Sequence, residues 1–124
     1  MKKLSTKVHG GIDYITAPTL MAAPSALDMN EGPESLVPLM LGAGALVYSA
    51  MTDYEFGLTR KISMKTHLAL DAASGVLLAA SPWLFGFARR TWLPHVALGL
   101  FEIAAALSTE TEPPASHKLA SLAA

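Results

Sequence analysis

The sequence contains no cysteine. This absence excludes disulfides, thiolate zinc sites, iron–sulfur clusters and cysteine nucleophiles together. Charge is also scarce, since charged residues make up 15% of the 124-residue chain, against about 25% in an ordinary soluble protein. The formal net charge is −1, which leaves no basic surplus for a nucleic-acid partner. A chain of this length predicts a single compact unit.

Long apolar stretches take the place of the missing charge. They cover about residues 8–27, 36–52, 66–87 and 92–108, and each approaches the roughly 20 helical residues that a bilayer core requires. A helix in a soluble four-helix bundle, the main alternative, needs charges that recur on its outer face. The second stretch, LVPLMLGAGALVYSAMT, has none. We therefore predict an all-α, four-span transmembrane helical bundle, with residues 1–109 as one membrane domain and 110–124 as a flexible C-terminal tail.

The distribution of lysine and arginine predicts the orientation of these spans. With four spans, the N-terminus, the loop around 53–65 and the C-terminal tail share one side of the membrane. That side holds seven basic residues: Lys2, Lys3, Lys7, Arg60, Lys61, Lys65 and Lys118. The opposite side holds Arg89 and Arg90. Both termini are therefore predicted to be cytoplasmic. A cleaved signal peptide is the alternative for the N-terminus, but His9, Asp13 and Pro18 interrupt its apolar region.

The chain also repeats itself at an offset of 57 or 58 positions. Five pairs match in order: His9 with His67, Asp13 with Asp71, Pro24 with Pro82, Gly42 with Gly99, and Thr52 with Thr109. The matches predict two similar helical hairpins, at about 8–52 and 66–109. Both hairpins begin on the same side, so a pseudo-two-fold axis along the membrane normal would relate them.

A short motif, Ser81-Pro82-Trp83, closes the third apolar stretch. Proline ends or kinks a helix, and the aromatic residues of SPWLFGF suit the interface belt of a membrane. The motif therefore predicts a bend at the outer interface. Together with the two H-x-x-x-D starts, it resembles the SPW-repeat family of small bacterial membrane proteins. In the first repeat only the proline is kept, within Ala23-Pro24-Ser25. The resemblance implies an integral protein of the bacterial cytoplasmic (inner) membrane, and implies no settled biochemical activity.

Ionisable residues inside the predicted spans are the most informative ones, because an Asp at a helix centre costs about 2.5–3.5 kcal/mol on insertion scales. Their distances from the span ends place six polar residues in one layer near the cytoplasmic face: His9, Asp13, Tyr48, His67, Asp71 and Glu102. His95 falls near the opposite end. The i, i+4 spacing puts each histidine on the same helix face as its aspartate.

Three interpretations of this layer stay open. In the first, each histidine pairs with its aspartate and holds the helices in register. In the second, His9, His67, Asp13 and Asp71 bind a metal or a haem, since imidazole and carboxylate suit zinc or iron. In the third, Asp71, Glu102 and the histidines relay protons or ions. The composition favours a structural or accessory membrane protein over an enzyme, with the lipid bilayer, a second copy or a membrane protein as its partner.

Overall fold

The structure, a computed structural model, describes residues 4–114, which contain four α-helices joined by loops. Helix α1 spans Thr6–Ala26, α2 Pro33–Ala50, α3 Met64–Leu84 and α4 Leu93–Ser108. The predicted all-α class and the number of helices are confirmed. The only extended pairing among the described residues consists of two isolated bridges, Leu4 with Thr109 and Thr52 with Ile62.

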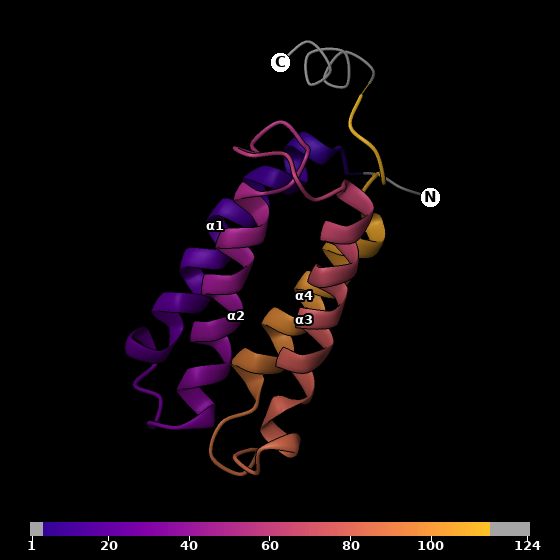
Figure 1. Cartoon of the computed structure of the whole chain (residues 1–124). Coiled ribbons are helices and arrows are strands. Elements are labelled where there is room, and N and C mark those ends of the chain that lie inside the picture. Colours follow the sequence, from indigo (N-terminus) through magenta and orange to yellow (C-terminus); the bar gives the residue numbers. More distant parts are fainter. Residues whose placement is uncertain (1–3, 115–124) are drawn as a thin grey trace.

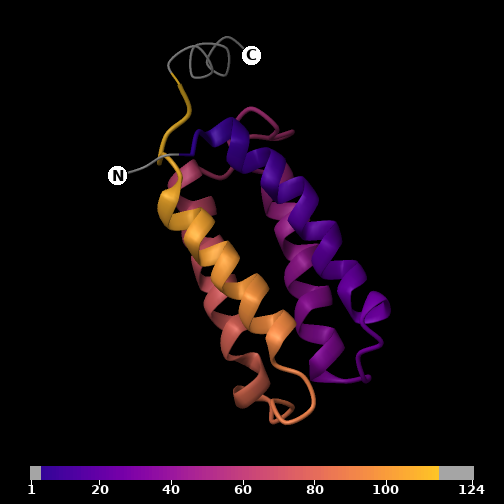
Figure 2. The same ribbon diagram turned by 180° about the vertical axis from the view of Figure 1, so that it is seen from behind.

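The helices form two hairpins that lie side by side (Figure 1). Helix α1 packs along α2, α3 packs along α4, and α2 touches α3 where the hairpins meet. The loop between α2 and α3 lies at the same end of the bundle as both ends of the described chain, and the two hairpin turns lie at the other end (Figures 1 and 2). We call these the loop end and the turn end.

Local chemistry sets where the helices begin and end. Ser5 and Ser63, which are 58 positions apart, cap α1 and α3 by accepting hydrogen bonds from the amides of Val8 and Thr66. Helices α2 and α4 instead carry a proline in their first turn. Because the serine caps lie outside the apolar runs, α1 and α3 begin about two residues earlier than hydropathy predicts.

Glycines allow the two helices of each hairpin to approach closely. A Cβ on Gly42 would lie 2.7 Å from the carbonyl oxygen of Ala17 on α1. A Cβ on Gly99 would lie 2.5 Å from the carbonyl oxygen of Gly75 on α3. Gly42 and Gly99 are equivalent in the repeat, so the same backbone contact occurs in both hairpins.

None of the four helices in the described part of the chain is both long and apolar enough to meet the usual requirement for a membrane span. The transmembrane part of the prediction is therefore not confirmed. Residues 1–3 and 115–124 lie outside the described residues. Most of the predicted flexible tail falls there, as do Lys2, Lys3 and Lys118.

Candidate functional site

The site is a cluster of two histidines and two aspartates between α1 and α3, toward the loop end. His9 and Asp13 project from one face of α1, and His67 and Asp71 from the equivalent face of α3. One nitrogen or oxygen of each side chain lies within 4.8 Å of the others. All four residues are at least nine-tenths shielded from solvent. These four residues of the predicted polar layer form the cluster itself, and the other two, Tyr48 and Glu102, border it.

The contacts run across the two helices as well as along them. The Nε2 atom of His9 lies 2.7 Å from Asp71 and 3.2 Å from Asp13. The Nε2 atom of His67 lies 3.1 Å from a carboxylate oxygen of each aspartate. The expectation that each histidine pairs with the aspartate of its own helix is therefore too narrow, because each aspartate is shared between both histidines.

The other ring nitrogen of each histidine contacts a threonine. Nδ1 of His9 lies 2.7 Å from the hydroxyl of Thr109, and Nδ1 of His67 lies 2.8 Å from that of Thr52. Both hydroxyls donate their single hydrogen to the backbone, at 2.6 Å from the carbonyl oxygens of Ala105 and Tyr48. A hydroxyl that has given its hydrogen can only accept. Both Nδ1 atoms are therefore N–H donors.

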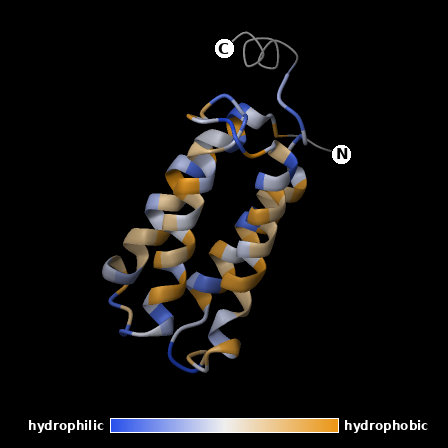
Figure 3. Ribbon diagram, viewed as in Figure 1, coloured by the Kyte–Doolittle hydropathy of each residue, from blue (hydrophilic) through white to orange (hydrophobic). Residues whose placement is uncertain are grey.

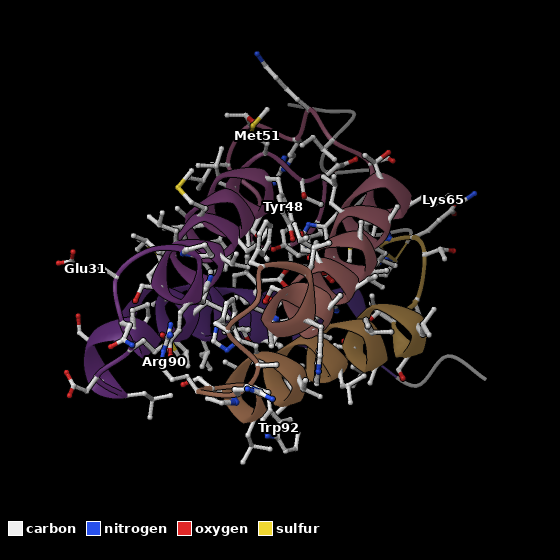
Figure 4. All side chains as sticks on the ribbon, turned by 90° about the horizontal axis from the view of Figure 1, so that it is seen from below. Glu31, Tyr48, Met51, Lys65, Arg90 and Trp92 are labelled. Atoms are coloured by element: carbon white, nitrogen blue, oxygen red, sulfur yellow. The ribbon has the colours of Figure 1, made fainter. Side chains whose placement is uncertain are left out.

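Two tyrosines hold the carboxylates. The hydroxyl of Tyr48 donates to Oδ1 of Asp71 at 2.5 Å, and that of Tyr54 donates to Oδ2 of Asp13 at 2.7 Å. Tyr48 points inward among the helices, whereas Lys65 and Trp92 point outward (Figure 4). Tyr54 comes from the α2–α3 loop yet is fully buried. Burial and the neighbouring Asp13 raise the pKa of the Tyr54 hydroxyl, which keeps it a donor.

Glu102, on α4, lies beside the cluster of histidines and aspartates. It lines a cavity of about 20 Å³ together with His9, Asp13 and Asp71. Its Oε2 atom is buried and has no hydrogen-bond partner among the described residues. A cavity of this size holds about one water molecule or one ion. The haem alternative fits poorly, because a porphyrin needs far more room than the space beside these histidines provides.

The turn end carries a separate polar group. His95 lies at this end, as its position in the sequence predicts. Its side chain is buried, and its Nε2 lies 2.8 Å from the carbonyl oxygen of Glu34. The Glu34 carboxylate, also buried, accepts a hydrogen bond from Arg90 at 3.0 Å. The sequence does not single out Glu34, because it stands in the short acidic segment DMNEGPE between two apolar stretches.

The Ser81-Pro82-Trp83 motif forms the end of α3. Ser81 and Pro82 are buried, while Trp83 is exposed and its ring centroid lies 6.5 Å from that of Trp92. Helix α3 ends two residues after the proline, and Gly86 follows with a positive φ of 79°. The motif thus stops the helix and presents a tryptophan pair at the surface of the turn end.

Sequence reasoning missed the roles of three residues. The match of Thr52 with Thr109 was visible, but nothing in the spacing showed that each hydroxyl reaches the histidine of the other repeat. Tyr54 carried no signal, because its segment, TDYEFGLTRK, has the composition of a solvated loop.

Equivalent residues of the two halves make equivalent contacts here, from the serine caps to the threonine–histidine pairs. The SPW repeat domain matches residues 7–109 of the chain. This chain belongs to the SPW repeat family. Apart from the first residue of α1, the match covers all four helices of the SPW repeat protein, and it includes every residue of the cluster. No curated protein and no solved structure matches it.

Proposed function

We propose that this SPW repeat protein is a small structural or accessory subunit embedded in the cytoplasmic membrane of a bacterium, with its loop end on the cytoplasmic side. One observation carries the proposal: most of the buried polar and charged side chains lie inside the bundle, and most of the large apolar side chains, apart from a few such as Leu20 and Leu78, lie outside it. The usual arrangement in water is the reverse.

The interior is polar and built from small residues. Its buried ionisable groups are His9, Asp13, Glu34, His67, Asp71 and His95. Most of its buried apolar residues are small or come from the ends of the helices, and alanine is the commonest of them. Small residues at helix contacts and polar side chains that bond between helices are typical of membrane bundles. Intramembrane ionisable residues likewise face the interior and pair with one another.

The outer surface is apolar on all four helices. Its exposed large side chains include Val8 and Ile15 on α1, Leu36, Met40 and Val47 on α2, Val76 and Leu84 on α3, and Leu93, Leu100 and Leu107 on α4. In the view of Figure 3, apolar residues recur along each helix, and the most hydrophilic segments lie mainly in the loops. Soluble monomers rarely leave so many large apolar side chains facing water together.

This arrangement also explains why each helix is only moderately apolar. A helix that turns one polar face to the interior has a lower mean hydropathy than a helix surrounded by lipid. The helices have 16 to 21 residues, which corresponds to lengths of about 24–32 Å, close to the roughly 30 Å of a bilayer core.

The described basic residues support the orientation. Lys7, Arg60, Lys61 and Lys65 lie at or near the loop end, whereas Arg89 and Arg90 lie at the turn end. An excess of lysine and arginine marks the cytoplasmic side. A proton relay through the whole bundle has less support, because the Glu34–Arg90 pair and His95 are engaged with each other at the turn end.

Alkaline extraction of membranes from expressing cells tests the embedding. We expect the chain to stay in the membrane pellet at high pH and to need detergent for solubilisation. Recovery in the aqueous fraction as a monodisperse protein without detergent would overturn the proposal.

Single-cysteine labelling tests the orientation, and the natural absence of cysteine makes the background clean. Thr59→Cys places a thiol in the exposed α2–α3 loop, and Arg89→Cys places one in the exposed α3–α4 turn. With a membrane-impermeant maleimide, we expect Arg89→Cys to label once the outer membrane, if there is one, is made permeable. Thr59→Cys should label only after the cytoplasmic membrane is opened. The opposite pattern would reverse the orientation.

A further inference from the structure

The tautomers of the two histidines determine what the cluster can hold. Both Nδ1 atoms are N–H donors to threonine hydroxyls whose own hydrogens are already donated. In a neutral imidazole the other nitrogen then carries a lone pair. In that neutral form, each Nε2 lone pair would face carboxylate oxygens, which are also acceptors. Nε2 of His9 lies at hydrogen-bond distance from Oδ2 of Asp71, at 2.7 Å, whereas Nε2 of His67 has no such partner among the described residues. Hydrogens on the rings or on the carboxyl groups, or one metal ion, have to lie between these nitrogens and oxygens.

His67 favours the metal ion. Its side chain is fully buried, and its Nε2 atom points into the cluster without any hydrogen bond among the described residues, although two carboxylate oxygens lie 3.1 Å away. A ring that carried a second proton would be expected to aim it at one of these oxygens. A nitrogen directed between two oxygens has the orientation of a metal ligand.

The distances and the charge fit one divalent ion. Ligands about 2.0–2.2 Å from a tetrahedral zinc lie roughly 3.3–3.6 Å from one another. The nitrogen–oxygen separations here are 2.7–3.2 Å, so the atoms need to separate by less than about 1 Å, and His9 and Asp71 need to separate the most. Two carboxylates and two neutral imidazoles carry a charge of −2, which a divalent ion balances.

The surrounding hydrogen bonds match those of metal centres. Ligating histidines normally donate their other N–H to a fixed acceptor, and ligating carboxylates are themselves hydrogen-bonded. Thr52 and Thr109 supply the acceptors, and Tyr48 and Tyr54 supply the donors. The two-nitrogen, two-oxygen donor set suits zinc-class transition metals, whereas magnesium and calcium prefer oxygen alone.

We propose that His9, Asp13, His67 and Asp71 bind one zinc-class divalent transition metal ion, which ties the first hairpin to the second. The site does not depend on the membrane proposal, because its ligands lie inside the bundle in lipid and in detergent alike.

Cobalt(II) titration of the purified full chain, after chelator treatment, tests the site. We expect one equivalent to bind and to give the intense visible absorption of tetrahedral cobalt, and we expect zinc to displace it. His9→Ala and His67→Ala should each weaken binding at least tenfold. His95→Gln is the matched control, because it changes a buried histidine at the turn end and should leave binding unchanged.

Thr52→Val separates a metal site from loss of folding. It keeps all four ligand atoms but removes the acceptor that fixes the His67 tautomer, and we expect binding about 10–100-fold weaker with helical content preserved by circular dichroism. Either of two results would overturn the proposal. One is a folded wild-type chain that binds no stoichiometric cobalt or zinc. The other is histidine variants that bind as tightly as the wild type. Both results are independent of whether the chain stays in the membrane pellet.

Discussion

At the scale of single residues, the threonine–histidine contacts link the two repeats. Thr109 ends the second repeat and accepts from His9, which begins the first. Thr52 ends the first repeat and accepts from His67, which begins the second. Each hairpin therefore fixes the ring orientation of the other hairpin's histidine.

The first prediction concerns Thr109→Val. Valine keeps the shape but leaves the Nδ1–H of His9 without its acceptor, and a buried unsatisfied donor costs about 1–3 kcal/mol. We expect the free energy of unfolding in detergent to fall by that amount. Thr19→Val is the control, because the exposed Thr19 hydroxyl also donates to a carbonyl four residues back but contacts no histidine. Equal losses in both variants would contradict this role of Thr109.

The second prediction concerns Tyr54→Phe. Phenylalanine keeps the buried ring but removes the hydrogen bond to Asp13, so we expect the free energy of unfolding to fall by about 1–3 kcal/mol. Hydrogen exchange in residues 51–63 should also speed up. Tyr14→Phe removes a more exposed hydroxyl, one bonded to the carbonyl of Phe56 in the same loop, and should change stability by less than about 0.5 kcal/mol. The account fails here if the two variants behave alike.

The sequence predicted part of this site. The i, i+4 spacing placed each histidine beside its aspartate, and the repeat indicated that the two pairs are equivalent. The contacts of His9 with Thr109 and of Asp13 with Tyr54 span 100 and 41 positions. Periodicity within one helix carries no information about such distant partners, so these residues were found only in the structure.

At the scale of elements, the apolar runs located all four helices. The ends were less accurate, because Ser5 and Ser63 cap α1 and α3 outside those runs. Hydropathy also placed the end of α3 at Phe87, whereas the helix stops at Leu84, shortly after Pro82.

The third prediction concerns the contact between α1 and α2. Gly42→Ala would place a methyl group 2.7 Å from the Ala17 carbonyl oxygen, which forces the helices apart. We expect a loss of about 1–3 kcal/mol in unfolding free energy, measured by thermal unfolding in detergent. Gly44→Ala is a matched control on the same helix, because nothing lies within 4 Å of its added methyl group. It should be neutral or slightly stabilising. A neutral Gly42→Ala would show that close helix approach is not needed.

At the scale of the whole molecule, the two hairpins touch each other less than the helices within each hairpin do. The cluster, the loop between α2 and α3, and the Glu34–Arg90 pair supply polar links between them. Of the three interpretations of the polar layer, only the shared metal or haem site required contacts between the hairpins, and hydropathy could not choose among them.

The fourth prediction concerns this link. His9→Ala and His67→Ala remove two members of one shared network, so their effects should not add. We expect the double variant to lose at least about 0.5 kcal/mol less stability than the sum of the single variants, as is typical of coupled neighbours. Pairing His9→Ala with His95→Gln should give additive losses, because His95 lies at the turn end. Additive losses in the first pair would mean that the histidines act separately.

The central claim is that the apolar outer surface of the bundle faces lipid, and spin-label accessibility tests it most directly. Val76→Cys and Leu107→Cys place single labels on exposed positions of α3 and α4 in a chain that has no other thiol. In lipid vesicles, we predict that both labels collide readily with oxygen and rarely with a water-soluble nickel chelate. A label at Thr59 in the α2–α3 loop should show the reverse. Ready collision of the Val76 and Leu107 labels with the nickel chelate would place these faces in water and contradict the account.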